Sequence, residues 1–119
     1  MSEDAVKAEV MEEKPAIEYV DLFPPVDIYE NEGAMKIYMD MPGVGSEDIS
    51  ISVEDQILTV TGDSDLKDEG KAVRFKRNFS ISKEVNATAI KAKMKDGVLE
   101  LILPKAESAK VHKIKVSTE

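Results

Sequence analysis

The amino-acid sequence predicts an all-β fold, an antiparallel immunoglobulin-like β-sandwich. Apolar and polar residues alternate through most of the chain after residue 25, and a period of two is typical of strands with one buried face. Turn-forming residues interrupt this alternation at intervals of about 8–12 residues. Helical spacing is confined to residues 1–14, where Val6, Val10 and Met11 could lie on one side of a short helix. About seven short strands with almost no helix indicate two sheets packed face to face.

Each expected strand has its own set of apolar residues. In chain order these are Val26 and Ile28; Met35, Ile37 and Met39; Ile49, Ile51 and Val53; the run 57–61; Val73, Phe75, Phe79 and Ile81; Ile90, Ala92 and Met94; and the run 98–103. Hydrophobic residues make up 42% of the chain but aromatic residues only 5%, so we expect a core of aliphatic side chains and methionine.

Turn residues separate these strands. Residues 31–33 (Asn-Glu-Gly) and 96–97 (Asp-Gly) are predicted hairpin turns, and residues 55–56 (Asp-Gln) are a predicted tight turn. Residues 41–45 should break the strand ladder, because proline has no N–H and glycine accepts left-handed angles. Residues 63–70 are charged and poor in apolar side chains, which predicts a solvated loop.

The chain of 119 residues has room for one domain. We assign residues 24–104 to the sandwich, residues 1–23 to a short N-terminal arm and residues 105–119 to a C-terminal extension. The apolar side chains between residues 17 and 23 have two interpretations. They either pack onto the domain or form an exposed, adhesive segment.

Composition argues against several classes of function. A net charge of −8 is unsuited to general nucleic-acid binding, which needs a basic surface. The chain has no cysteine and one histidine, His112, which makes a soft-metal site or a nucleophile–histidine–acid arrangement implausible. Its six glycines stand singly and form no phosphate-binding loop. We therefore expect no enzyme, no catalytic residue, no cofactor, no metal site and no small-molecule substrate.

Hydropathy and cysteine usage predict a cytoplasmic protein without a membrane partner. No apolar run approaches the length of a membrane span, and the acidic start lacks the basic segment of a signal peptide. The absence of cysteine suits a reducing compartment.

Charge is distributed unevenly along the chain. Residues 1–70 carry a net charge of −15, and residues 71–119 carry +7. Two solvated faces of one domain would explain this pattern. Alternatively, the basic C-terminal part meets an acidic N-terminal part of the same chain or of another chain.

Three motifs in order resemble those of the small heat-shock proteins, whose shared unit is the α-crystallin domain. The hairpin formed by Ala92, Gly97, Val98 and Leu99 is similar to the family's signature hairpin, and Pro104 closes the strand that follows it. Residues 40–49 resemble the family's proline–glycine loop and its next strand. Ile114-Lys115-Val116 resembles the C-terminal Ile-x-Ile/Val motif. The resemblance spans residues 24–116 and points to bacterial and archaeal members.

This resemblance implies a docking groove between strands 48–54 and 90–95. Ile114 and Val116 project from the same side of an extended segment, which suits addition to a sheet edge; a disordered tail is the alternative. The candidate groove residues are Ile49, Ile51, Val53, Ile90, Ala92 and Met94, and alternation could send some of them to the core instead. Lys113 and Lys115 flank the docking residues, and acidic side chains bracket strand 48–54, so we expect docking to weaken as salt rises.

The resemblance also implies a dimer interface at Phe75, Arg77 and Phe79. Arg77 shares the apolar phase of its strand, and an unpaired buried guanidinium is costly, so it should find a carboxylate or lie at an interface. Otherwise the side chain snorkels to solvent from the strand end.

Two segments depart from the family pattern. The stretch 62–75 is short for the bacterial and archaeal type, so the strand that members exchange between subunits is expected to be missing, and two copies of strand 72–81 could pair instead. The arm is also short, which questions large assemblies.

The function that the resemblance implies is an ATP-independent holdase that binds unfolding client proteins and forms homo-oligomers under stress. The alternatives are a CS-type co-chaperone of an ATP-driven chaperone and an assembly-defective member with weak client activity.

Overall fold

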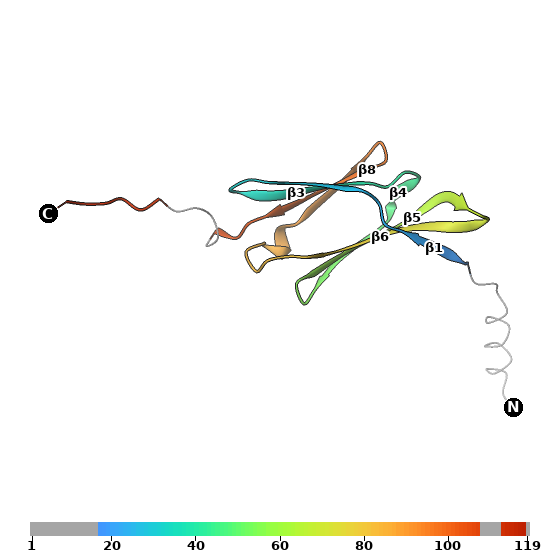
Figure 1. The fold of residues 1–119 in the computed structure, drawn as a ribbon, viewed down its shortest axis with the longest axis horizontal. Coiled ribbons are helices and arrows are strands. Elements are labelled where there is room, and N and C mark those ends of the chain that lie inside the picture. Colours follow the sequence, from blue (N-terminus) through green and yellow to red (C-terminus); the bar gives the residue numbers. More distant parts are fainter. Residues whose placement is uncertain (1–16, 108–112, 119) are drawn as a thin grey trace, which may run out of the picture.

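The fold is a sandwich of two four-stranded sheets (Figure 1). The structure, a computed structural model, describes residues 17–107 and 113–118. Its elements are β1 (Tyr19–Leu22), β2 (Val26–Glu30), β3 (Ala34–Asp40), β4 (Val44–Glu54), β5 (Ile57–Asp68), β6 (Lys71–Ser80), the 3-10 turn η1 (Ala87–Ala89), β7 (Lys91–Lys95) and β8 (Val98–Pro104). The predicted all-β sandwich is confirmed.

The strand order leaves β4 and β7 at edges of different sheets. Sheet 1 has the order β1-β6-β5-β4, and sheet 2 has the order β2-β3-β8-β7. All neighbours are antiparallel except β1, which runs parallel to β6. Along their outer edges, the main-chain N–H and C=O groups of β4 and β7 therefore have no neighbouring strand of the same sheet to pair with.

The core lies between the sheets and is aliphatic and methionine-rich, as the composition predicts. Ile37 and Met39 of β3 are 1% and 0% exposed, and Leu58 and Val60 face them from sheet 1 at 0% exposure. The remaining buried core residues are Met41, Val44, Val73, Phe75, Ile81, Leu99, Leu101 and Leu103. Alternation therefore assigned the buried face correctly in β3 and β8, whereas Ile28 of β2, on the predicted apolar face, is 51% exposed.

Three two-residue hairpin turns have positive φ at both positions. They are Asp55-Gln56, Glu69-Gly70 and Asp96-Gly97. This geometry matches the right-handed twist of the strands that it joins, which is why such turns connect antiparallel neighbours. The predicted turns at residues 55–56 and 96–97 are confirmed.

The expected solvated loop at residues 63–70 is wrong. β5 continues to Asp68, turns at residues 69–70, and pairs back onto β6 with Lys67 opposite Ala72. Charged side chains can point to solvent while their main chain pairs, so low apolar content did not exclude a strand. A register shift between Asp63 and Lys67 marks the irregular part of this hairpin. There the Ser64 hydroxyl donates to the Pro42 carbonyl at 2.8 Å and accepts from Leu66 N at 3.1 Å.

The N-terminal apolar segment contributes a strand to sheet 1. β1 pairs with residues 72–75 of β6, and Ala72 N donates to the Glu18 carbonyl at 3.1 Å. The Arg74 guanidinium lies 3.9 Å from the centre of the Tyr19 ring and donates to Asp63 Oδ1 at 2.8 Å. The hydrogen bond to Asp63 raises the pKa of Arg74 above its already high usual value. Parts of the segment pack on the domain, whereas the flanking Ile17 and Phe23 are 68% and 71% exposed.

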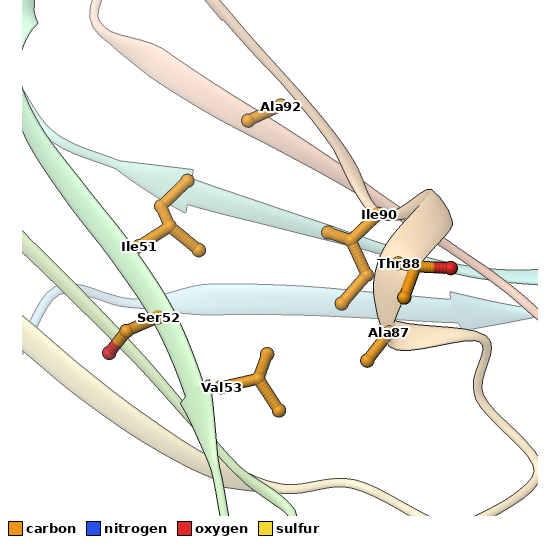
Figure 2. A pocket seen from close by; sticks show the side chains of 7 residues that line it. All are labelled: Ile51, Ser52, Val53, Ala87, Thr88, Ile90 and Ala92. Atoms are coloured by element: carbon orange, nitrogen blue, oxygen red, sulfur yellow. The ribbon is translucent and has the colours of Figure 1, made fainter.

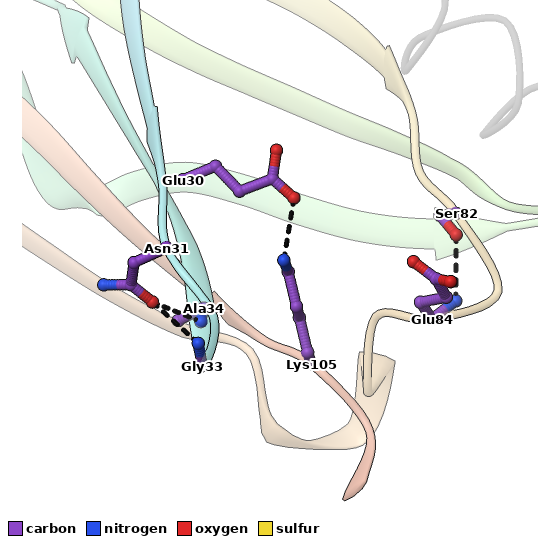
Figure 3. A network of polar contacts seen from close by, with 7 residues as sticks. All are labelled: Glu30, Asn31, Gly33, Ala34, Ser82, Glu84 and Lys105. Atoms are coloured by element: carbon purple, nitrogen blue, oxygen red, sulfur yellow. Dashed lines mark hydrogen bonds and ion pairs between the residues drawn. The ribbon is translucent and has the colours of Figure 1, made fainter. Parts of the chain in front are cut away.

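Polar contacts fix the end of the sandwich where the chain leaves β8 (Figure 3). Lys105 Nζ lies 2.9 Å from Glu30 Oε2, and Ala106 N donates to the Glu84 carbonyl at 2.6 Å. In the same region the Asn31 side chain accepts from Gly33 N and Ala34 N at 2.8 Å, which confirms the predicted turn at residues 31–33. These contacts therefore fix the position of Lys105 and Ala106, with which the C-terminal extension begins.

Candidate functional site

An apolar groove runs between the edge strands β4 and β7. Its wide pocket, of about 470 Å³, is lined by Ile51, Ser52, Val53, Ala87, Thr88, Ile90 and Ala92 (Figure 2). Its narrow pocket, of about 230 Å³, is lined by Ser46, Ile49, Ile51, Ala92, Lys93, Met94 and Leu99. Ile51 and Ala92 belong to both pockets and therefore form the saddle between them.

The strand period explains why the groove is apolar. Ile49, Ile51 and Val53 point to the inner side of sheet 1, but β4 is its last strand, so the sandwich covers them only in part. Figure 2 shows Ile51 and Val53 directed toward the β7 side while Ser52 points away. Val53 remains 36% exposed, which leaves apolar surface available to a ligand.

All six predicted groove residues lie along this groove. Ile49, Ile51, Ile90 and Met94 also pack against the core cluster. The choice between core and groove is therefore not exclusive, because these side chains are half-buried and contribute to both.

The residues that close the two ends of the groove were not predicted from the sequence. Ala87 and Thr88 of η1 close the wide pocket, and Ser46 lines the narrow one. A signal for η1 was present, because Asn is a favoured residue at the start of a helical turn. The Asn86 side chain accepts from Thr88 N at 3.2 Å.

Opposite charges border the two sides of the groove. Glu47, Asp48 and Glu54 are exposed on β4. Lys91, Lys93 and Lys95 alternate with the groove residues of β7 and are exposed on the outer side of sheet 2. A positively charged ligand segment is therefore attracted to the β4 side of the groove.

The predicted signature hairpin, which links β7 to β8, contacts the segment that follows β3 at one end of the sandwich. Gly97 has φ +78°, and its carbonyl accepts from Met41 N at 2.7 Å. Leu99 is 1% exposed and belongs to the core, whereas Val98 is half-buried and Ala92 lies in the groove. The hairpin thus positions β7 against the residues that follow β3.

The outer face of sheet 2 carries a polar pair near β7. The Tyr38 hydroxyl donates to Glu100 Oε2 at 2.8 Å, and this hydrogen bond raises the pKa of Tyr38. The Tyr29 ring lies edge-on to Tyr38 with their centres 5.8 Å apart. These contacts join side chains of β2, β3 and β8 on the outer face of sheet 2.

The C-terminal motif is exposed. Ile114 and Val116 are 88% and 86% exposed, and Figure 1 shows residues 113–118 extending away from the sandwich. Lys113 and Lys115 are exposed beside them. His112 lies outside the described residues.

The predicted interface residues lie on β6. Phe75 is 7% exposed and pairs with Leu22 of β1, so β1 occupies this part of the β6 edge. Arg77 Nε donates to the Pro24 carbonyl at 2.9 Å, so within residues 17–107 and 113–118 its hydrogen-bond partner is a main-chain carbonyl, and the interface remains the open alternative of the prediction. Phe79 is half-buried and packs against the core. β1 ends at residue 22, opposite Phe75, so it does not cover residues 76–80 of β6. These residues pair with β5 on their other side.

In the part of the chain that the structure describes, two other kinds of site are missing. No group of three or more histidine, cysteine or acidic residues is placed to hold a metal ion. No helix there is long and apolar enough to span a membrane.

The fold and the groove define a β-sandwich with an open apolar seam at the edge of its two sheets. The model of the Hsp20/alpha crystallin family matches residues 27–117, and the chain belongs to this family. It is similar to the small heat shock protein C2 of Rickettsia felis, with 31% identity over 106 residues that cover 81% of this chain and 69% of the relative. It is 34% identical to a probable 15 kDa heat shock protein of Leptospira interrogans over 82% of this chain and 81% of the relative.

Other relatives are longer than this chain. The mitochondrial heat shock 22 kDa protein of Pisum sativum is 39% identical over 84 residues, which cover 66% of this chain and 42% of that protein. Among solved structures, hspA from Xanthomonas axonopodis matches with a TM-score of 0.63 and 27% identity over 72% of this chain and 96% of that one. A small heat-shock protein from Xylella fastidiosa matches with a TM-score of 0.62 and 25% identity over 80% of this chain and 96% of that one. Family membership supports a chaperone role, and small heat-shock proteins act without ATP and are generally not enzymes.

Proposed function

We propose that this protein is an ATP-independent holdase that binds unfolding client proteins and limits their aggregation. Membership of the Hsp20/alpha crystallin family carries the proposal. The groove supports it, because half-buried aliphatic side chains on an open sheet edge suit the extended apolar segments that unfolding proteins expose. Binding such segments lowers the concentration of aggregating species by mass action. No residue is assigned a catalytic role.

The groove is also the proposed docking site for the C-terminal motif of another copy. Ile114 and Val116 are exposed, and they project from the same side when the segment is extended. Their flanking lysines suit the acidic β4 side, so docking should weaken at high salt. Docked tails would cover the groove and therefore regulate client access. The Xylella relative is described as having a distinct high order structure, which favours homo-oligomers here as well.

Dimerisation is proposed to use β6. The strand that family members exchange was expected to be missing, and a direct hairpin joins β5 to β6 at this place, so pairing of two β6 edges is the simpler route. β1 covers residues 72–75 of that edge, so the pairing segment would be residues 76–80, which include Arg77 and Phe79. We further propose that residues 1–23 act as an arm, residues 24–104 as the domain and residues 105–119 as the assembly extension, in the cytoplasm.

Light scattering from a heat-labile client protein tests the holdase proposal. With no nucleotide present, the chain should suppress aggregation at a near-equal molar ratio of subunits to client. No suppression at any temperature or salt concentration would contradict the proposal and turn the search to a specific partner.

Two matched substitutions test the role of the groove. Ala92→Arg places a large charged side chain on the saddle, whereas Ser50→Arg adds the same side chain at an exposed position of β4 that lines neither pocket. We expect only Ala92→Arg to reduce protection of the client. Equal protection by both variants would mean that clients bind elsewhere.

A further inference from the structure

Four methionines lie in the part of the chain that the structure describes, and their surroundings differ. Met39 and Met41 are 0% exposed and belong to the core. Met35 is half-buried on β3, an interior strand flanked by β2 and β8. Met94 is also half-buried, but it lies on the edge strand β7 and lines the narrow pocket of the groove. Its thioether therefore borders a pocket that is open to solvent.

We propose that Met94 is a site of reversible oxidation, and that its sulfoxide makes the narrow end of the groove polar and weakens the binding of apolar segments. The inference rests on the proposed function, in which the groove holds extended apolar segments of client proteins. It adds a modification site and a way to switch that binding.

Hydrogen peroxide is the oxidant in this reaction. The methionine sulfur bonds to one peroxide oxygen as the O–O bond breaks, and the products are methionine sulfoxide and water. The sulfur loses two electrons, and the peroxide gains them. A methionine sulfoxide reductase reverses the step, because two thiols give up two electrons, become a disulfide and release the oxygen as water.

The narrow pocket gives peroxide access to the Met94 sulfur. Its volume of about 230 Å³ is several times the ~30 Å³ that a water molecule occupies in the liquid. Hydrogen peroxide is only slightly larger than water, so it reaches the thioether without any opening of the sandwich. Met39 and Met41 are fully buried, so the core must open locally before an oxidant reaches them. Oxidation should therefore start at Met94 and spare the core.

The pocket offers a sulfoxide oxygen few hydrogen-bond donors. Of the polar residues in its lining, Ser46 donates its hydroxyl to Glu47 Oε2 at 3.4 Å, and Lys93 is exposed on the outer side of sheet 2. An apolar segment that covers an oxidised Met94 therefore buries an acceptor without a donor, which is unfavourable. The apolar lining residues besides Met94 are Ile49, Ile51, Ala92 and Leu99.

Peptide-resolved mass spectrometry tests where oxidation starts. The full chain is treated with hydrogen peroxide, samples are quenched with catalase at increasing times, and the sulfoxide at each methionine is quantified. We expect Met94 to react about tenfold faster than Met39 and Met41, and faster than Met35, because reactivity follows exposure. Core methionines that react as fast as Met94, or a Met35 that reacts first, would overturn the assignment of the site.

Binding to the groove is measured by the fluorescence anisotropy of a labelled peptide of alternating valine and threonine, which is apolar on one side when extended. Samples are oxidised until Met94 has reacted and the core methionines have not. We expect oxidation to weaken peptide binding to the wild type about tenfold, the ratio that corresponds to one buried acceptor left without a donor.

Matched substitutions assign this effect to one sulfur. Met94→Leu keeps the apolar volume and removes the sulfur, so peptide binding should resist peroxide. Met35→Leu makes the same change at the other half-buried methionine and should leave the sensitivity to peroxide unchanged. Met94→Gln places an amide oxygen near the position of the sulfoxide oxygen and should bind the peptide weakly without any oxidant. Equal sensitivity of Met94→Leu and the wild type would overturn the switch.

Repair distinguishes a switch from damage. Treatment with the two methionine sulfoxide reductases, one for each sulfoxide epimer, and dithiothreitol should restore peptide binding. Binding that stays weak after Met94 is reduced would overturn the switch, and so would a circular dichroism spectrum that shows unfolding after oxidation. The holdase proposal fails separately, if the untreated chain neither binds the peptide nor protects a client. The order of oxidation among the methionines still tests Met94 as the modified site in that case.

Discussion

Gly62 occupies a position in the core where a single added methyl group should be costly. It lies on β5 between Ile49 of β4 and Phe75 of β6, and it is buried. A Cβ atom at this position would overlap Met41 Cε and lie 3.1 Å from Val44 Cγ1. Met41 is 0% exposed and Val44 is 8% exposed, so neither side chain can move into solvent. The glycine is therefore needed for space, since its φ is outside the left-handed region.

The substitution Gly62→Ala combines two opposing effects. Overpacking a filled core costs about 1–3 kcal/mol. Alanine also restricts the unfolded chain, which stabilises the fold by about 0.4–1 kcal/mol. We expect a net loss of about 1–2 kcal/mol in the free energy of unfolding. For a chain of this size the loss corresponds to a fall in Tm of about 4–8 °C.

Thermal unfolding followed by circular dichroism measures this effect. All variants are compared at one protein concentration, because self-association raises the apparent Tm. Gly33→Ala is the control, since its Cβ would meet Asn31 Oδ1 at 3.7 Å, an ordinary contact, and its Tm should stay the same or rise slightly because alanine restricts the unfolded chain. Met41→Leu in the Gly62→Ala chain removes the overlapping Cε and should restore part of the loss. A Gly62→Ala protein as stable as the wild type, or no rescue by Met41→Leu, would refute the packing argument.

Three further substitutions have expected outcomes. Gln56→Gly should stabilise the protein by about 0.5–1 kcal/mol in urea unfolding, because Gln56 has φ +63° and glycine adopts this region without strain; an unchanged midpoint would show that the turn is unstrained. Tyr38→Phe should lower stability near neutral pH by removing the bond to Glu100. Because folding raises the pKa of Tyr38, its contribution is present below pH of about 10 and is lost as pH rises through the folded value; a difference from wild type that does not shrink there would contradict this assignment. Tyr19→Ala should speed hydrogen exchange in β1 several-fold with little effect on global stability, since it removes the contact with Arg74; unchanged exchange would mean that main-chain pairing alone holds β1.

Alternation was sufficient to predict most of the sandwich from the sequence. Residues such as Ile37, Met39 and Leu101 occupy every second position, and each is at most 1% exposed. The groove side chains follow from the same rule, because a strand at a sheet edge keeps its inward face but loses part of its cover. The sequence did not predict which strands pair with each other, because the apolar pattern does not indicate which strand lies at the edge of a sheet.

Polar pairing and local hydrogen bonds explain what was missed. The hairpin at residues 63–71 is held by its main chain and by Ser64, so its side chains give no apolar period. Arg77 was expected to find a carboxylate or to lie at an interface, and the carbonyl of Pro24 accepts its hydrogen bond. Such a partner depends on where the chain crosses from one sheet to the other, which only the three-dimensional structure shows.

The parallel pairing of β1 with β6 has a consequence for synthesis on the ribosome. β1 pairs with residues 72–75, so about 50 further residues must be made before its partner exists, which takes roughly 3–10 s. During that interval the residues of β1, Tyr19–Leu22, have no sheet to join. A nascent chain of this protein therefore carries an unpaired apolar strand until residues 72–75 are made. Pairing of β1 with residues 72–75 of β6 ends this exposure for the part of the segment that forms β1.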